Sequence, residues 1–186
     1  MKRVSDLLLV LFVMVIAFVP IIIVIILIKL TSKGPVIYWS ERVGQNNIIF
    51  PMPKFRSMHV GTPTVATHLL QNAQSVLTPI GGFLRKSSLD ELPQLWCILN
   101  GSMSFVGPRP ALFNQKDLIN LRTELGVDKA LPGLTGWAQV NGRDELPLYK
   151  KIELDKEYVQ NRSFLFDMYI LWLTLGKVVC RNNVSH

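Results

Sequence analysis

The chain carries an uninterrupted apolar run from Leu7 to Ile28, and no other feature limits its fold as strongly. As a helix rising ~1.5 Å per residue, the run would be about 33 Å long, enough to cross a hydrocarbon core of about 30 Å. It is too long for the apolar part of a signal peptide, and no small-residue cleavage pattern follows it. We therefore expect a membrane segment that remains attached to the mature protein.

Two interpretations of this segment remain open. A single straight helix that spans the bilayer is the usual outcome for such a run. Pro20 argues against it, because an internal proline removes a backbone hydrogen bond and kinks the helix. Both flanks are also basic, with Lys2 and Arg3 before the run and Lys29 and Lys33 after it, so the positive-inside rule selects no orientation. Both ends of the segment could therefore face the cytoplasm.

The predicted organisation is a membrane segment over residues 1–33 and one domain over 34–186, which is long enough to bury a core. The formal net charge of +7 favours anionic partners, namely lipid headgroups, nucleotides, phosphates or nucleic acid, without choosing among them. Cys97 and Cys180 lie too far apart in sequence to indicate a zinc site, and two cysteines make no disulfide framework. A reducing, cytoplasmic setting fits this composition.

Residues 34–50 contain short apolar and aromatic runs separated by Gly44-Gln45-Asn46-Asn47, which predicts a β-hairpin. Strand content is expected to end near Phe50. Residues 60–79 are polar and contain Gly61, Pro63 and Pro79, so a loop with one short helix is expected there.

Helical patterns cover residues 122–128 and 148–161, where Lys151 and Asp155 have the i,i+4 spacing of a surface pair. Residues 164–180 form a further apolar stretch, but the polar residues within it make a poor membrane span. Asp167, Thr174 and Arg181 recur every seven residues and share one stripe of that helix. A helix on the membrane surface and a helix packed on the core fit this pattern equally well.

Asp90 and Glu91 form an acidic pair next to a predicted helix start. Ser88 and Glu91 have the spacing of a capping box, which would place Asp90 in the first helical turn, although Pro93 makes the start of the helix uncertain. Acids at a helix start often do no more than complement the helix dipole. The pair alone therefore does not establish a catalytic site.

Cationic residues recur beside glycines and prolines, where rigid turns would present them to phosphate oxygens. The alternative is that each is an ordinary exposed surface charge. Trp137 also lies in a turn-rich stretch, and for a lone tryptophan packing on the core is more common than stacking on a base. The cations in question are Lys54, Arg56, Arg85, Lys86, Arg109 and Arg143.

Four linked motifs occur in order at residues 54–58 (Lys-Phe-Arg-Ser-Met), 85–95, 103–110 (Met-Ser-Phe-Val-Gly-Pro-Arg-Pro) and 132–143. Together they resemble the bacterial sugar transferase family, the small monotopic phosphoglycosyl transferases. The resemblance implies a mainly α fold with a small β-hairpin. It also implies an N-terminal re-entrant membrane helix-break-helix and a helical catalytic domain at the membrane interface.

The implied reaction transfers a sugar-1-phosphate from a UDP-sugar to undecaprenyl phosphate, releasing UMP through a covalent aspartyl phosphosugar intermediate. An N-acetylated hexosamine is the expected sugar, and the step would be the first membrane step of glycan assembly. The implied location is the cytoplasmic face of the bacterial inner membrane, with Mg²⁺ as cofactor and membrane lipids, but no nucleic acid, as further partners. The sugar, the pathway and the oligomeric state remain open.

By position in the motifs, Asp90 matches the family's nucleophile, and Glu91 matches its acidic neighbour, which is associated with magnesium and catalysis; both are candidate metal ligands. Pro20 matches the helix-breaking proline. The implied substrate-binding residues are Lys54, Arg56, Arg85, Arg109 and Arg143.

The chain departs from the family pattern at two positions. Val19 stands where a serine usually precedes the proline, so the bend would rest on Pro20 alone, and Ser102 replaces the usual aspartate before the Gly107–Pro110 loop. Two other hypotheses compete with the transferase: a non-catalytic module that binds anionic lipid, and a membrane-tethered nucleotide-sugar hydrolase.

Overall fold

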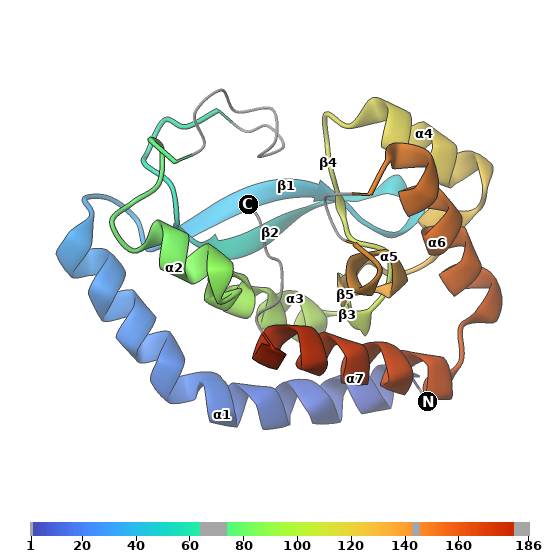
Figure 1. Cartoon of the computed structure of the whole chain (residues 1–186), viewed down its shortest axis with the longest axis horizontal. Coiled ribbons are helices and arrows are strands. Elements are labelled where there is room, and N and C mark those ends of the chain that lie inside the picture. Colours follow the sequence, from blue (N-terminus) through green and yellow to red (C-terminus); the bar gives the residue numbers. More distant parts are fainter. Residues whose placement is uncertain (1, 64–73, 143–145, 181–186) are drawn as a thin grey trace.

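A computed structural model describes residues 2–63, 74–142 and 146–180 of the chain. The fold is mostly helical with two small sheets (Figure 1). The mainly α expectation is therefore confirmed, but the β content exceeds a single hairpin. One sheet has the strand order β2-β1-β4, and the other pairs β3 (Ser104–Val106) with β5 (Gly133–Thr135) in parallel.

The apolar run forms helix α1 (Lys2–Thr31), which continues through Pro20 and is visibly bent in Figure 1. Among the described residues it alone is long and apolar enough to cross a membrane. Its buried residues Asp6, Val10, Ala17, Val24 and Ile28 recur at spacings of four and seven, which places them on one stripe. That stripe packs on the rest of the protein, and most of the other side chains of α1 are exposed.

Both ends of α1 are hydrogen-bonded to the domain that follows. At the first end, Lys2 Nζ binds Asp167 Oδ2 at 2.6 Å, and Asp6 Oδ2 accepts a hydrogen bond from Ser104 Oγ at 2.8 Å. At the other end, the Arg56 guanidinium donates to the Ser32 hydroxyl at 2.9 Å and to the Lys33 carbonyl. The helix is thus held at two widely separated points.

The predicted hairpin is confirmed as β1 (Ile37–Val43) and β2 (Ile49–Phe55), joined by η1 (Gln45–Asn47). Asn46 and Asn47 adopt positive φ, which asparagine tolerates better than most residues. The expectation that strand content ends near Phe50 is wrong. Pro51 and Pro53 fit inside β2 because it is an edge strand, where a missing N–H costs no ladder hydrogen bond.

Between the hairpin and the second sheet lie α2 (Gly81–Lys86), η3 (Leu89–Gln94) and α3 (Leu95–Asn100). Half of the stretch 60–79, where a loop with one short helix was expected, lies outside the described part of the chain, which lacks residues 64–73. The short strand β4 (Ala111–Leu112) pairs with β1.

Helices α6 (Leu148–Asn161) and α7 (Phe164–Cys180) match their predicted ranges. The helix predicted over residues 122–128 is wrong: α4 (Lys116–Glu124) ends earlier, Gly126 adopts φ 71°, and η4 (Val127–Lys129) follows. The left-handed turn at Gly126 separates α4 from η4, whereas the sequence pattern predicted one continuous helix. The short helix α5 (Trp137–Val140) completes the fold.

Helix α7 lies beside the first half of α1 (Figure 1), and Asp167 and Thr174 of its predicted polar stripe turn inward. Arg181 lies outside the described residues. Asp167 is buried, and Thr174 Oγ1 lies 2.8 Å from Thr135 Oγ1. Trp172 and Leu175 are instead exposed. Packing of the helix on the core is therefore confirmed, and its open apolar face leaves the membrane-surface interpretation a prediction.

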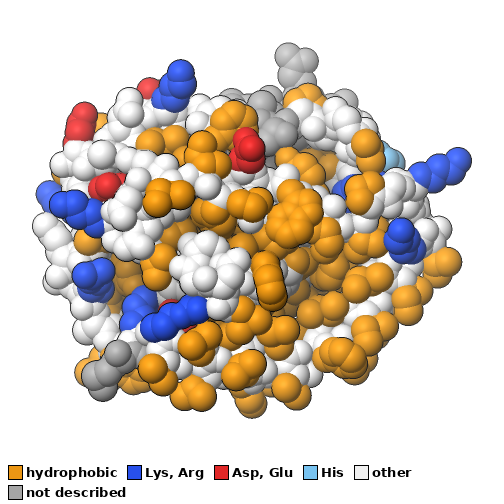
Figure 2. Space-filling view, turned by 180° about the vertical axis from the view of Figure 1, so that it is seen from behind, with side chains coloured by type: hydrophobic (Ala, Val, Ile, Leu, Met, Phe, Trp, Pro, Cys, Tyr) orange, Lys and Arg blue, Asp and Glu red, His pale blue; other side chains and the backbone are white. Residues whose placement is uncertain are grey.

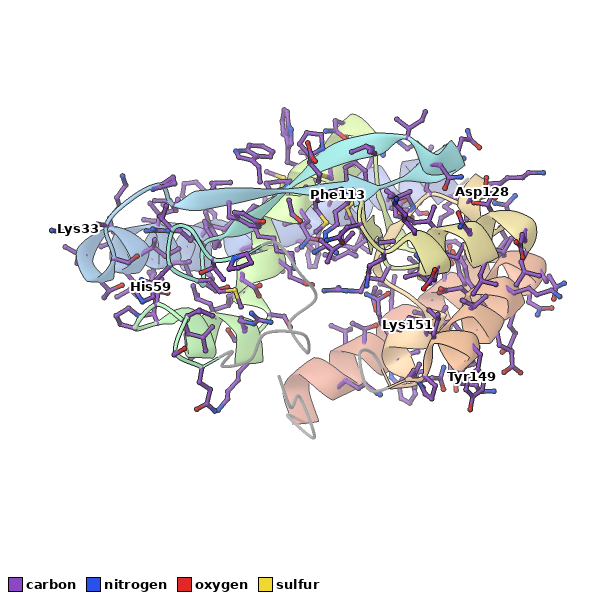
Figure 3. All side chains as sticks on the ribbon, turned by 90° about the horizontal axis from the view of Figure 1, so that it is seen from above. Lys33, His59, Phe113, Asp128, Tyr149 and Lys151 are labelled. Carbon is purple, nitrogen blue, oxygen red and sulfur yellow. The ribbon has the colours of Figure 1, made fainter. Side chains whose placement is uncertain are left out.

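Figure 2 shows hydrophobic side chains gathered over a broad area, with charged side chains mostly at its margins. Seen from above, Lys33 and His59 lie at one end of the molecule, and Asp128 and Tyr149 at the other (Figure 3). The exposed large apolar residues of α1 and α7 include Leu8, Leu11, Phe12, Val15, Phe18, Ile22, Leu165, Trp172 and Leu175. An exposed apolar surface of this size is typical of a membrane or partner contact.

Candidate active site

Asp90 and Glu91 lie in the first turn of η3 and are both buried, so their predicted position at a helix start is confirmed. The capping box is not formed. Ser88 adopts φ 57° and makes no side-chain capping bond. The left-handed residue turns the chain sharply between α2 and η3, which directs the two acids into the protein.

Glu91 is held by two cations from different parts of the chain. Its Oε1 accepts hydrogen bonds from Lys54 Nζ of β2 and from Arg109 NH2, each at 2.9 Å. Burial alone would raise the pKa of the Glu91 carboxyl, but Arg109 and Lys54 outweigh it and hold that pKa well below its usual range. Glu91 is therefore ionised. It joins β2, η3 and the loop Gly107–Pro110, called the Arg109 loop below, in one charged cluster.

Asp90 is in a different environment from its neighbour. Burial raises the pKa of Asp90 to about 6, and the adjacent Glu91 charge adds to this, while Lys54, Arg85 and Arg109 oppose it. Within the described ranges, its carboxyl forms no side-chain hydrogen bond or salt bridge. A buried carboxylate with a raised pKa that faces several cations is a typical candidate for a functional group.

The loop that carries Arg109 packs against the segment Gly133–Gly136, which is β5 and the residue after it. Gly107 N–H donates to the Thr135 carbonyl and Gly133 N–H to the Pro108 carbonyl, each at 2.9 Å. A Cβ on Gly107 would lie 2.3 Å from the Leu131 carbonyl oxygen, and one on Gly136 would lie 2.1 Å from that of Gly107. Both positions exclude any side chain, so the glycines of these two motifs fix the position of the Arg109 loop.

The other predicted substrate-binding residues lie in different places. Arg85, at the end of α2, contributes to the electrostatic environment of Asp90 and lies within 3.7 Å of the Met58 sulfur. Arg56 is buried, and its recorded hydrogen bonds go to the end of α1 rather than to the acidic pair. Arg143 lies outside the described residues. The structure thus brings Lys54, Arg85 and Arg109 together around the acids.

The family model described as "Bacterial sugar transferase" matches residues 1–181. The chain belongs to this family. It is 38% identical over 187 residues to a Bacillus subtilis (strain 168) protein named "Uncharacterized sugar transferase EpsL", covering 100% of this chain and 90% of that protein. The predicted family is therefore confirmed, and the acidic pair lies inside the matched region.

Two further relatives of this bacterial sugar transferase carry names that state a reaction. The Escherichia coli (strain K12) "UDP-glucose:undecaprenyl-phosphate glucose-1-phosphate transferase" is 38% identical over 95% of the chain. The Salmonella typhimurium "Undecaprenyl-phosphate galactose phosphotransferase" is 36% identical over 82% of it. The chain spans only 40% and 35% of those two proteins, respectively.

The carboxylates of the site can be compared with the oxygen ligands that Mg²⁺ needs. Nowhere in residues 2–63, 74–142 and 146–180 do three or more His, Cys, Asp or Glu side chains gather to hold a metal ion. Mg²⁺ bound with a phosphorylated substrate needs only one or two carboxylates, because phosphate oxygens and water complete its shell. Asp90 and Glu91 satisfy that smaller requirement.

The roles of two buried acids were missed in the sequence analysis. Asp155 was assigned to a surface pair with Lys151, but it is only 2% exposed and binds Arg122 of α4. Asp6 was given no role from the sequence, yet it binds the start of β3. The signal for Asp6 was an acid one residue before an apolar run, which calls for a partner. Trp137, by contrast, packs on Phe166 as predicted.

Proposed function

We propose that this bacterial sugar transferase moves a sugar-1-phosphate from a UDP-sugar to undecaprenyl phosphate and releases UMP. The observation that supports this most directly is the pairing of a buried Asp90 of raised pKa with a Glu91 neutralised by Lys54 and Arg109. The first group is suited to attack a phosphorus atom, and the second keeps cations beside it.

In the proposed first step, an Asp90 oxygen forms a bond to the sugar-bearing phosphorus, and the bond from that phosphorus to the UMP oxygen breaks. In the second step, a phosphate oxygen of the lipid attacks the same phosphorus and releases Asp90. Two unit charges 4 Å apart repel by about 4 kcal/mol at an effective dielectric near 20. An ionised Asp90 therefore needs cations to approach a diphosphate, and Lys54, Arg85 and Arg109 lie where they can supply that charge.

The proposed magnesium ion would be held by Asp90 and Glu91 together with donor phosphate oxygens. When bound, it would neutralise phosphate charge that the protein's own cations leave uncompensated. Loss of product formation in excess chelator, restored by added Mg²⁺, is the expected result. Full activity in chelator would remove the metal from the proposal.

We further propose that α1 is re-entrant and lies with the domain on the cytoplasmic side. A straight spanning helix would carry its two ends to opposite membrane faces, whereas here Lys2 and Asp6 at one end and Ser32 at the other bind the same domain. Pro20 lies between these two anchor points and supplies the reason for the bend.

Labelling of single cysteines tests this topology in a chain whose Cys97 and Cys180 are replaced by alanine. A cysteine added before Met1 and one at the exposed Tyr149 should both be protected from an impermeant thiol reagent in intact cells and react after lysis. Reaction of the N-terminal cysteine alone from outside would establish a spanning helix. Replacing Pro20 should shift the population toward that outcome.

Purified protein, Mg²⁺, undecaprenyl phosphate and a UDP-sugar test the reaction itself. UMP and a lipid diphosphosugar should appear together. UDP as the nucleotide product, or equal UMP release without any lipid product, would overturn the transferase in favour of a glycosyl transferase or a hydrolase. No turnover with bound anionic lipid would favour the non-catalytic module.

The donor sugar is the least constrained part of the proposal. The resemblance points to an N-acetylated hexosamine, whereas the relatives' names mention glucose and galactose. A panel of UDP-glucose, UDP-galactose, UDP-N-acetylglucosamine and UDP-N-acetylgalactosamine decides between them. Turnover of a plain hexose alone would reject the N-acetylated donor and leave the reaction type intact.

A further inference from the structure

A buried ion pair joins helices α4 and α6 behind the Arg109 loop. Arg122 Nε and NH2 donate to Asp155 Oδ2 at 3.0 and 2.6 Å. Both residues are almost fully buried, with 8% and 2% of their surfaces exposed. Ion pairs this deep add little net stability compared with apolar residues of similar volume, so stability alone is a weak reason for their presence.

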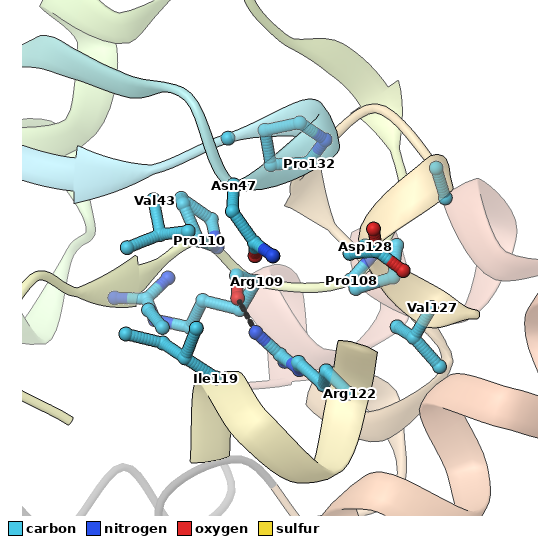
Figure 4. Close-up of a pocket in the computed structure, with 13 residues that line it drawn as sticks. Val43, Asn47, Pro108, Arg109, Pro110, Ile119, Arg122, Val127, Asp128 and Pro132 are labelled. Atoms are coloured by element: carbon cyan, nitrogen blue, oxygen red, sulfur yellow. Dashed lines mark hydrogen bonds between the residues drawn. The ribbon is translucent and has the colours of Figure 1, made fainter. Parts of the chain in front are cut away.

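The third contact of Arg122 is directed at the site. Its NH1 donates to the Arg109 carbonyl oxygen at 2.8 Å, which is the dashed line in Figure 4. From the same residue, Arg109 NH2 reaches Glu91 Oε1 at 2.9 Å. A continuous chain of polar contacts therefore runs from Asp155 through Arg122 and Arg109 to Glu91.

The surroundings of this contact show why Arg122 matters to the loop. A small cavity of about 30 Å³ lies on this side of the loop, lined in part by Val43, Asn47, Ile119 and Asp128 (Figure 4). On this side the loop is held by hydrogen bonds to its successive backbone carbonyls. Gly133 N–H binds the Pro108 carbonyl, and Arg42 NH1 binds the Pro110 carbonyl at 3.2 Å. Arg122 supplies the bond to the carbonyl between them.

We propose that Arg122, held in place by Asp155, is a positioning residue for the transfer reaction. It fixes the backbone of Arg109, so that the Arg109 guanidinium stays on Glu91 and beside Asp90. The inference rests on the proposed function, because it assigns Arg109 a part in that reaction. The competing explanation is that the pair only ties α4 to α6 and affects activity through folding.

A double-mutant cycle separates these explanations. Arg122→Lys keeps a cation opposite Asp155 but loses the planar guanidinium that bonds Asp155 and the Arg109 carbonyl together. Misplacing a substrate-orienting group by about 1 Å costs on the order of 100-fold. We expect Arg122→Lys to lower kcat/KM for the donor by about 10- to 100-fold in the native background. In an Arg109→Ala background it should cost less than about 3-fold, because the group that it positions is already gone.

The matched control is Glu153→Gln, which breaks the exposed Lys150–Glu153 pair on the same helix α6. Its activity should stay at the wild-type level. All assays run below the lowest melting temperature of the set, and if Arg122→Lys does not fold, Asp155→Asn takes its place in the cycle. The Kd for UDP is also measured for the four proteins of the cycle, so that the comparison does not depend on turnover.

Equal losses from Arg122→Lys with and without Arg109, in both kcat/KM and UDP affinity, would overturn the positioning role. A wild-type protein that binds UDP but yields no lipid product contradicts the proposed function instead, and the UDP cycle still decides the inference. A protein that neither binds UDP nor turns over a donor overturns both.

Discussion

Two of the regions that bury carboxylates, the start of α1 and the start of η3, differ in how those carboxylates are bonded. Where the start of α1 meets β3 and α7, Asp6 accepts hydrogen bonds from the Ser104 hydroxyl and the Phe105 N–H, at 2.8 and 3.2 Å. Asp167 in the same region binds Lys2 at 2.6 Å and the Tyr158 hydroxyl at 2.8 Å. In η3, Asp90 has nearby cations but no side-chain hydrogen bond within the described residues.

The difference separates hydrogen-bonded structural acids from the carboxylate that we propose as the nucleophile. Buried polar groups are nearly always hydrogen-bonded, so the Asp6 and Asp167 arrangement is what a stable helix junction requires. An ionised carboxylate that lacks such bonds destabilises the folded state, and proteins keep this kind of strain mainly at sites of chemistry. Glu91 lies between the two cases, since its bonds to Lys54 and Arg109 stabilise it and hold the cations near Asp90.

The largest effect is expected from Asp90→Asn, which should abolish transfer while stabilising the protein. Activity should fall by roughly 1000-fold or more, because the proposed nucleophile is removed. The folded pKa of about 6 lies above the ordinary 3.8, so ionised Asp90 destabilises the fold above pH 6 by at most about 3 kcal/mol. The gain in melting temperature should therefore be full at pH 7 and vanish below about pH 4.

Thermal unfolding at pH 7 and pH 4 measures the gain, and intact-mass analysis after incubation with donor measures the covalent adduct. Wild type should gain the mass of a sugar-1-phosphate, and Asp90→Asn should not. Normal turnover of the variant would remove Asp90 from the mechanism. Unchanged stability at pH 7 would show that Asp90 is not strained.

Glu91→Gln should have the next largest effect, with the opposite sign on stability. Loss of the anion leaves Lys54 and Arg109 without the carboxylate that holds them, so we expect activity to fall by about 100-fold. The unfolding free energy should also fall, by about 1–3 kcal/mol, as two partly buried cations lose their partner. Steady-state kinetics and thermal unfolding, run beside Asp90→Asn, make the comparison. A rise in the unfolding free energy of Glu91→Gln would contradict the conclusion that the Glu91 carboxylate holds Lys54 and Arg109.

The third prediction concerns pH. If Asp90 must be ionised to attack, the rate of UMP release without acceptor should fall about 10-fold per pH unit below about pH 6. Single-turnover measurement without undecaprenyl phosphate avoids the titration of the lipid phosphate, whose second pKa is also about 6 by analogy with phosphoserine. In Lys54→Met this fall in the rate of UMP release should begin at higher pH, because Lys54 lowers the Asp90 pKa. A flat profile between pH 5 and 7 would reject this assignment.

The fold elements predicted best from the sequence are those that local pattern determines. The helix at residues 148–161 and the turn at Gly44–Asn47 depend on periodicity and turn chemistry, and both occur where predicted. The acidic pair was also located correctly, because a sequence motif marked it. Pro51 and Pro53 fit into β2 because β2 is an edge strand. Its edge position depends on which strands lie beside it, so the local sequence pattern does not predict it.

The partners of charged residues were the least predictable part. Asp155 has the spacing of a surface pair with Lys151, but it turns inward to Arg122, which lies 33 residues away in sequence. Arg56 fits a phosphate-binding motif as well as Lys54 does, yet it lies just past the end of β2 and binds Ser32, whereas Lys54 lies within β2 and binds Glu91. These partners come from distant parts of the chain, so only the packed structure reveals them.

The smallest effect on catalysis, and the sharpest check on the comparison, should come from Asp167→Asn. The change removes the charge that holds Lys2, but Tyr158 can still donate to the Val106 carbonyl at 3.0 Å. We expect the unfolding free energy to fall by about 1–3 kcal/mol, while kcat and KM of the folded enzyme stay within about 3-fold of wild type. Kinetics at a temperature where both proteins are folded measures this. If Asp167→Asn lowered kcat as much as Glu91→Gln does, the junction of α1 and α7 would belong to the active site, and the division between structural and reactive acids would fail.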